Sequence, residues 1–387
     1  MKHKYIAKRY WKDITTPMGQ SDVLAQQYND VIDLSLGDPD LITDNIIIEN
    51  AMNDAKLGHT KYTDFRGDRE LRDEIRKYYK EEHNIVFNDE EVMVVTSGCL
   101  AMYLALEAII DDGDEVIIHQ PGFTPYPQQI ELARGVSVVL DTYEKDDFQI
   151  NTNRLEGLIT ERTKAIIINS PNNPTGTCFT RETLENIAAI AKKYDLIIIA
   201  DDIYGLYSFK EPFIPIVTLE EMKQRTITIN SFSKDFTMTG WRIGHILAPD
   251  FIIKTIQQIN ENLVFTAPSI SQRGAIYALR HRKEIQPKML EEYKKRVFYA
   301  ADFINKIPNM SVLPPKGTFY LFVNIKKTGL SSVEISNRIL NEAHVLTLPG
   351  IAFGDCGEGY IRIACTCTIN KLKNAFERIA KMDIFKA

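Results

Sequence analysis

Short apolar runs alternate with amphipathic segments through the middle of the chain. The runs are rich in β-branched residues and apolar at consecutive positions, which predicts strands of a sheet covered on both faces. In the segments between them apolar residues follow helical spacing, as with Leu71, Ile75 and Tyr79, and Thr180 is a candidate N-cap for a later segment. The predicted strands are Val92–Val95, Val116–His119, Val136–Leu140, Ala165–Asn169, Leu196–Asp201, Thr226–Asn230 and Ile243–Leu247. This alternation predicts an α/β domain with a mostly parallel sheet.

The two ends of the chain do not share this alternation. Residues 1–45 are irregular, whereas a long charged helix is expected at Lys283–Lys306 and a strand at Thr318–Asn324. We therefore expect a second, smaller α+β domain built from both termini. The predicted division is residues 1–45 for an N-terminal arm and part of the small domain, 46–270 for the large domain and 271–387 for the small C-terminal domain.

The composition is that of a globular protein and argues against several classes of function. Of the 387 residues, 44% are hydrophobic and 25% are charged. The net charge of −6 disfavours nucleic acid as the main partner. No apolar run approaches the ~20 residues of a membrane span, and the N-terminus lacks the apolar core of a signal peptide. The five cysteines lack zinc-type spacing, so we expect reduced thiols, no metal site and a cytoplasmic location.

Candidate chemistry begins with the segment SFSKDFTMTGWRIG at residues 231–244, directly after a predicted strand. Two hydroxyls, from Ser231 and Ser233, and the guanidinium of Arg242 suit a phosphate dianion. A lysine beside an anchored phosphate, here Lys234, could form a Schiff base with a phosphorylated aldehyde. A plain Ser/Gly turn with an unrelated arginine is the alternative for this segment taken alone.

Three further segments also follow predicted strands. NSPNNPTGTCFT, at residues 169–180, is a rigid loop in which Asn173 could present its amide to a ligand. LIIIADDIY ends a strand in Asp201, whose carboxylate needs a cationic partner if it is buried, with Tyr204 within reach of the same ligand. Thr-Ser-Gly at residues 96–98 precedes a helix, where backbone N–H groups can bind an anion. Together these segments supply what pyridoxal 5′-phosphate requires.

From about residue 30 to its end the sequence resembles the class I/II aminotransferases, the fold type I family of pyridoxal-phosphate enzymes. The resemblance is carried by the patterns SxSKxxxxxGxRxG, NxPxNPTG and DxxY, which occur here in SFSKDFTMTGWRIG, NSPNNPTG and DDIY. It implies a large domain with a seven-stranded, mostly parallel sheet beside a small domain. It also implies a homodimer with shared active sites.

The resemblance assigns roles to residues of this chain. Lys234 matches the Schiff-base lysine, Asp201 the partner of the pyridine nitrogen, and Tyr204 and Asn173 the donors to the phenolic oxygen of the cofactor. The remaining cofactor contacts that it implies are the backbone amides of Cys99 and Leu100, the phosphate ligands Ser231, Ser233 and Arg242, the stacking ring of Phe123, and Tyr62, which reaches the phosphate of the neighbouring subunit.

Two positions also match the family's substrate contacts. Arg362, in GYIRIA, aligns with the arginine that binds the α-carboxylate of the substrate, and Gly37, in LSLGDPD, with a backbone contact to the same group. Asn173 belongs to this set as well. A bidentate guanidinium fixes the orientation of a carboxylate in a way that lysine cannot.

The implied activity is transfer of an amino group from an L-amino acid to a 2-oxo acid such as 2-oxoglutarate, by a ping-pong mechanism through Lys234. Several aromatic residues suggest an aromatic-lined pocket and favour an aromatic or bulky neutral donor: Tyr5, Tyr10, Trp11, Phe123, Tyr126 and Tyr320. A carbon–sulfur β-lyase on the same fold is one alternative, which Thr177 after Gly176 disfavours because such lyases tend to carry arginine there. A non-catalytic cofactor-binding sensor module is the alternative of another class.

Overall fold

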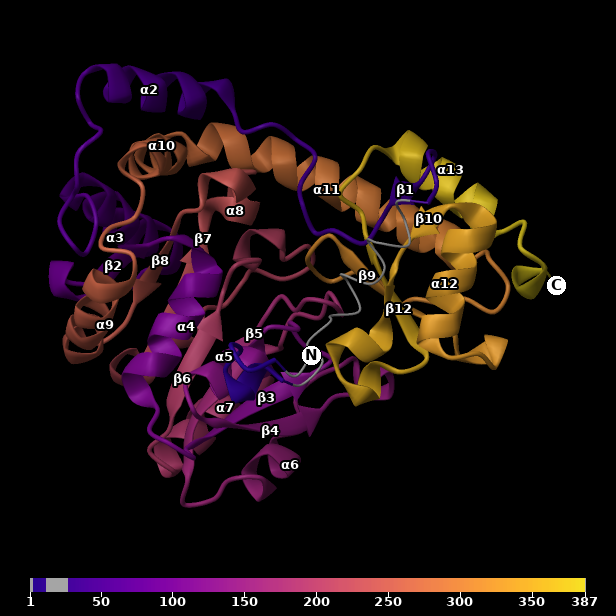
Figure 1. The fold of residues 1–387 in the computed structure, drawn as a ribbon, viewed down its shortest axis with the longest axis horizontal. Helices are drawn as coiled ribbons and strands as arrows, with labels where there is room; N and C mark the ends of the chain where they lie inside the picture. The colour runs from indigo at the N-terminus through magenta and orange to yellow at the C-terminus, as the bar shows by residue number, and fades with distance from the viewer. Residues whose placement is uncertain (1–2, 12–26, 387) are drawn as a thin grey trace.

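We describe residues 3–11 and 27–386 in a computed structural model of the chain. A seven-stranded sheet with helices on both faces makes up one part of the molecule, and a smaller group of strands and helices lies beside it (Figure 1). This is the predicted α/β architecture with a smaller α+β part. The domain boundaries at residues 45 and 270 stay a prediction.

The large sheet has the order β2-β8-β7-β6-β5-β3-β4. The strands from β7 to β4 in this order are parallel, and β8 runs antiparallel to both of its neighbours. The bounds are β2 (Val92–Val95), β3 (Glu115–Gln120), β4 (Val136–Asp141), β5 (Thr163–Asn169), β6 (Ile197–Asp201), β7 (Thr226–Ser231) and β8 (Gly244–Leu247). All seven predicted strands are therefore present, with ends within two residues of the prediction.

One of these strands differs from the prediction in its burial. The apolar run Val136–Leu140 was expected to be covered on both faces, yet β4 is the edge strand of the sheet. Val136 and Val139 are 47% and 41% exposed. An apolar, β-branched sequence favours strand conformation at an edge as well as in the middle, so the pattern alone does not separate the two positions.

Helices cover the sheet because its strands direct alternate side chains to opposite faces. Met93 and Val95 pack into the cluster with α4, α5 and α9, whereas Val92 and Val94 pack on the other side, against α3 and α10. The helices of this part are α2 (Asn45–Lys56), α3 (Arg69–His83), α4 (Ser97–Ile109), α5 (Tyr126–Leu132), α6 (Thr152–Gly157), α7 (Arg181–Lys193), α8 (Phe232–Asp235), α9 (Asp250–Leu263) and α10 (Ser269–Arg280). As predicted, Thr180 caps α7, accepting a hydrogen bond from the Thr183 N–H at 3.1 Å.

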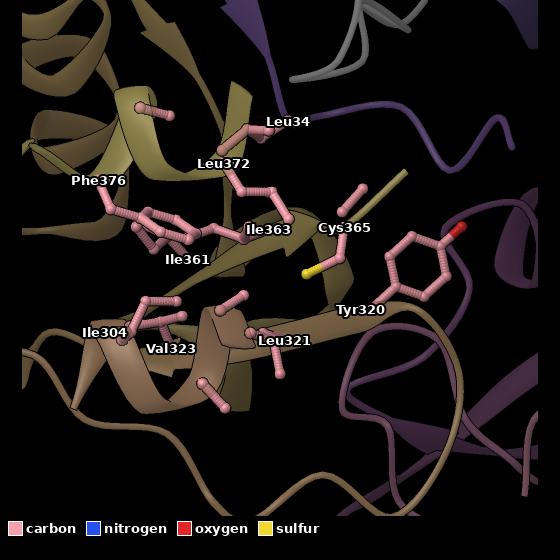
Figure 2. Close-up of a cluster of buried hydrophobic side chains, with 14 of the residues drawn as sticks. Leu34, Ile304, Tyr320, Leu321, Val323, Ile361, Ile363, Cys365, Leu372 and Phe376 are labelled. Carbon is pink, nitrogen blue, oxygen red and sulfur yellow. The ribbon is translucent and has the colours of Figure 1, made fainter. Parts of the chain in front are cut away.

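The smaller part joins the two ends of the chain. Its three-stranded sheet has the order β11-β12-β9, and β1, near the N-terminus, pairs in parallel with β10. Leu34 packs with Ile304, Val323, Ile363 and Phe376 in its core (Figure 2). The elements are β1 (Ile32–Asp33), α11 (Arg282–Ile304), β9 (Tyr320–Asn324), α12 (Ser332–Ala343), β10 (Val345–Leu346), β11 (Leu348–Pro349), β12 (Tyr360–Ala364) and α13 (Ile369–Ile379).

A buried ionic cluster joins three helices of the large part. The guanidinium of Arg273 on α10 lies 2.5 Å from the carboxylate of Asp54 on α2, and the two side chains are only 8% and 10% exposed. It also reaches Glu70 on α3 at 2.5 Å and Asp68 at 3.2 Å. Removing the cation would leave the Asp54 carboxylate buried without its ionic partner.

We expect Arg273→Met to lower the free energy of unfolding by about 3–5 kcal/mol, the cost typical of breaking a buried ion pair. Arg181→Met is the control, because the Arg181–Glu185 pair is exposed and should contribute almost nothing. Urea unfolding followed by far-UV circular dichroism measures both variants. Equal midpoints for the two variants would contradict the expectation.

Candidate active site

A cavity of about 480 Å³ opens between the large sheet and the smaller part. It lies where parallel strands β5, β6 and β7 end at one edge of the sheet, the usual ligand position in such folds. Its lining consists of Leu36, Gly37, Asp38, Ser97, Gly98, Cys99, Met102, Phe123, Tyr126, Gln129, Asn169, Asn173, Asp201, Ile203, Tyr204, Ser231, Ser233, Lys234, Thr239, Gly240, Arg242, Tyr320 and Arg362.

One end of this cavity is suited to an anion. The first turn of α4 meets Ser231 and Ser233 there, and the two serine hydroxyl oxygens are 2.9 Å apart. Arg242 lines the same end, its guanidinium donating to the carbonyl of Thr239 at 2.6 Å. A Cβ atom on Gly244 would lie 2.8 Å from the Asn230 carbonyl and 3.2 Å from the Gly98 nitrogen. Only glycine at this position therefore lets β8 approach the start of α4 so closely.

Asp201 ends β6 at the middle of the cavity. The hydroxyl of Tyr126 donates to its carboxylate Oδ2 at 2.5 Å, and the Asn169 amide donates to its main-chain carbonyl at 2.8 Å. Burial raises the pKa of Asp201 to about 6, although the hydrogen bond from Tyr126 opposes that rise. A cationic group placed against this carboxylate would be strongly favoured, because it would return the carboxylate to its ionised form.

Lys234 lies on α8, directly after β7. Its Nζ donates a hydrogen bond to the carbonyl oxygen of Gly37 at 2.5 Å. Burial lowers the pKa of Lys234 to about 8. The charge of the nearby Asp38 opposes this shift, whereas the charge of Arg362 adds to it. The neutral amine, the form that can act as a nucleophile or a base, is therefore well populated near pH 8.

Arg362 comes from β12 in the smaller part and is 3% exposed. Its Nη1 donates to the Asn173 side-chain oxygen at 3.0 Å and its Nη2 to the Ser35 carbonyl, while its Nε is buried without a hydrogen-bond partner. The rings of Tyr320 and Phe353 lie 4.5 and 4.9 Å from the guanidinium carbon. Burial also lowers the pKa of Arg362. A carboxylate ligand would satisfy both the free N–H and the unpaired charge.

Two tyrosines and a glycine close the cavity beside this arginine. The hydroxyls of Tyr204 and Tyr320 are 3.0 Å apart. A Cβ atom on Gly37 would lie 1.6 Å from the Tyr320 hydroxyl oxygen, so any larger residue at this position would displace the Tyr320 ring. The N-terminal segment thus brings its backbone directly against the side chains that face a ligand.

Most of the residues that the motifs suggested meet in this cavity, and a few do not. Leu100 does not line it, its N–H lying 3.4 Å from the Ser97 hydroxyl. Tyr62 is also absent from the lining and is 80% exposed, its ring 4.9 Å from that of Phe265. The N-terminal aromatic residues that were expected to line the pocket, Tyr5, Tyr10 and Trp11, do not line it either.

Sequence reasoning missed the role of Tyr126 as the hydrogen-bond partner of Asp201, since it counted this residue only among aromatic pocket candidates. It also missed Asn169, which holds both Asp201 and the Asn173 N–H. The available signal was position: Tyr126 follows the stacking candidate Phe123 by three residues and begins α5, soon after β3.

Within residues 3–11 and 27–386, no helix has the length and apolar character to cross a membrane. The same part of the chain contains no group of three or more metal-ligating side chains close enough to hold an ion.

Comparisons with known proteins agree with this site. The family model for class I and II aminotransferases matches residues 29–379. The chain is 38% identical to the aspartate aminotransferase of Pyrococcus abyssi over 93% of each chain. It is 36% identical to aromatic-amino-acid aminotransferase 2 of Thermococcus litoralis, again over 93% of each chain.

Solved structures give the same result. A crystal structure of an aromatic aminotransferase from Pyrococcus horikoshii matches with a TM-score of 0.89 and 36% identity, covering 93% of this chain and 98% of that chain. These relatives favour neither a β-lyase nor a sensor module. The resemblance inferred from the motifs is confirmed, and the chain belongs to the class I and II aminotransferases.

Proposed function

We propose that this aminotransferase uses pyridoxal 5′-phosphate to move an amino group from an aromatic or bulky neutral L-amino acid to a 2-oxo acid such as 2-oxoglutarate. One observation carries the proposal: the amine of Lys234, the carboxyl group of Asp201 and the guanidinium of Arg362 line one cavity, and burial shifts the pKa of each. These are an amine, a counter-ion for a ring cation and a carboxylate receptor.

The donor set fits the cofactor. Ser231, Ser233, Arg242 and the backbone at the start of α4 would hold the phosphate. Asp201 would pair with the ring nitrogen, and the burial that raises its pKa favours a cationic partner. Asn173 and Tyr204 would donate to the phenolic oxygen, with Phe123 against the ring. The bound cofactor supplies an aldehyde that takes up amino groups and a ring that withdraws electrons from the substrate Cα.

The residues of the chain supply the proton chemistry. Arg362 would bind the substrate α-carboxylate in a bidentate manner and fix the Cα–H bond relative to Lys234. Lys234 would then remove the Cα proton at Nζ, as a general base whose pKa is lowered to about 8. The hydrogen bond from Tyr126 holds the Asp201 carboxylate in place throughout.

The preference for a neutral donor rests on the cations of the cavity. Among the described lining residues these are Lys234, Arg242 and Arg362, and each already has a role above. None remains for a second carboxylate on the substrate side chain. The lining also contains aromatic and aliphatic side chains, including those of Leu36, Met102, Phe123, Ile203 and Tyr320. One relative is named an aspartate aminotransferase and another an aromatic aminotransferase, so both donors belong in the test.

The decisive experiment adds single amino acids to the holoenzyme without any 2-oxo acid. Aromatic and bulky neutral donors should abolish the visible band of the bound cofactor and release one 2-oxo acid per site, with no further turnover. Lys234→Ala should fold and bind the cofactor yet lose at least about 10²-fold in rate. Continuous release of pyruvate from cystathionine or cysteine would instead identify a β-lyase, and a response to aspartate alone would overturn the neutral preference.

The carboxyl group of Asp201 predicts a pH dependence of cofactor binding. Its pKa of about 6 without a ring cation should fall when that cation binds, so binding releases a proton below pH 6. The affinity should therefore weaken as the pH falls through about 6, and Asp201→Asn should remove this step together with most of the activity. Equilibrium dialysis of wild type and variant at several pH values measures it. Parallel curves for the two proteins would show that the ring nitrogen is bound elsewhere.

We also propose a cytoplasmic homodimer. The exposed ring of Tyr62 and its contact with the half-exposed Phe265 support an intersubunit contact, and the free thiols support a reducing compartment.

A mixing experiment tests the shared site. Lys234→Ala and Tyr62→Ala subunits are each expected to be impaired, but a mixed dimer would contain one site with both native residues. Activity should therefore rise when the two variants are exchanged in solution, with each variant alone as the control. No recovery despite subunit exchange shown by native mass spectrometry would contradict the assignment of Tyr62.

A further inference from the structure

A second, much smaller cavity lies behind the main one. It measures about 10 Å³, and Ser231 lines both cavities, so this serine separates the inner cavity from the anion end of the site. Its polar lining consists of Tyr78, Asn230, Ser231, Asp235, His245 and Gln286. A polar space of this size accommodates one water molecule.

Two residues that line the inner cavity each have a buried polar atom without a partner. Asp235 is 5% exposed and its Oδ1 has no hydrogen bond, and His245 is 4% exposed and its Nδ1 has none. The two side chains make no direct ion pair with one another in the described part of the chain. Buried polar groups in native proteins are almost always satisfied, so each of these atoms calls for a partner.

The protonation states of the pair are complementary. Burial raises the pKa of Asp235 well above its usual value, which favours the protonated carboxyl group, the form that can donate. Burial lowers the pKa of His245 to about 3, so its ring is neutral. When Nε2 carries the ring proton and donates to the Tyr79 hydroxyl, 3.4 Å away, Nδ1 is the acceptor of the ring. A water molecule that accepts from the acid and donates to the imidazole would satisfy both groups.

The inner cavity lies against the helix that carries the catalytic lysine. Asp235 directly follows Lys234 on the four-residue helix α8, and Lys234 lines the main cavity while Asp235 lines the inner one. The Tyr207 hydroxyl also holds this helix, by donating to the Lys234 carbonyl at 2.9 Å. A short helix with so few backbone hydrogen bonds depends on such side-chain contacts for its position.

We propose that one ordered water molecule occupies the inner cavity, joins the Asp235 carboxyl group to Nδ1 of His245, and thereby fixes the orientation of Lys234. Asp235 and His245 are positioning residues in this arrangement, since they act through α8. The water site stands on its own observations, whereas the positioning role rests on the proposed function of Lys234.

A crystal structure of the holoenzyme, refined to a resolution that shows ordered water, tests the site directly. It should show one water within hydrogen-bond distance of Asp235 Oδ1 and His245 Nδ1. A soak in thallium(I) should give no anomalous peak there. An empty cavity, a direct Asp235–His245 contact or a bound monovalent cation would each overturn the proposal, whatever the enzyme's substrate proves to be.

Matched variants test the positioning role. Asp235→Asn keeps a neutral polar group and should retain most of kcat and the water, whereas Asp235→Leu should lower kcat by up to about 10²-fold with little change in KM. It should also shift the pH midpoint of the visible cofactor band, which reports on Lys234. His83→Phe is the control, because His83 packs on the same Tyr78 and Tyr79 rings without lining the cavity.

The outcomes separate the two parts of the inference. If Asp235→Leu does not fold, His245→Phe, which removes the acceptor and keeps a ring, must show the same loss of kcat and shift of the band. Unchanged kcat and an unchanged band in a folded Asp235→Leu protein would overturn the positioning role. Equal losses in Asp235→Asn and Asp235→Leu would show that Asp235 acts as an anion, which also overturns it.

Discussion

Charged side chains withdrawn from water impose the main constraint on this structure. Burial raises the pKa of Asp201 and lowers the pKa values of Lys234 and Arg362. Each shift favours the neutral form, because burial penalises the charge. None of the three has an ionic partner among the described contacts, and the hydrogen bonds from Tyr126 to Asp201 and from Lys234 to Gly37 offset only part of the cost. The ring cation and aldehyde of the proposed cofactor would relieve Asp201 and Lys234, and the carboxylate of a substrate would relieve Arg362.

The sheet supports this arrangement because parallel strands end at one edge. Asn173, Asp201 and Lys234 are far apart in sequence, yet they follow or end the adjacent strands β5, β6 and β7. Apolar runs and the polar residues that follow them were therefore enough to predict the strands of the sheet and several residues that meet in the cavity. The local sequence did not identify β4 as the edge strand. A strand is at the edge when it has a neighbour on one side only, and the hydrophobic pattern of a strand does not report its neighbours.

The substrate half of the cavity was less accessible to such reasoning. Arg362 was assigned only by resemblance, and its setting between Tyr320 and Phe353 depends on contacts across the smaller part. The close approach of Gly37 to Tyr320 joins residues near opposite ends of the chain. The roles of Tyr126 and of the Asp235–His245 cavity depend on where a side chain points after packing, which periodicity does not report.

The pairing of the N-terminal β1 with the late strand β10 has a consequence for biosynthesis. All strands of the large sheet have left the ribosome once residue 247 emerges, so the cofactor half can begin to assemble while the chain is still growing. Gly37 has been synthesised by then, but β10 and Arg362 have not. At ordinary translation rates, on the order of ten seconds pass before β10 and Arg362 are synthesised. During that interval the nascent chain contains Asp201, Ser231 and Lys234 but not yet Arg362, so the two sides of the cavity are completed at different times.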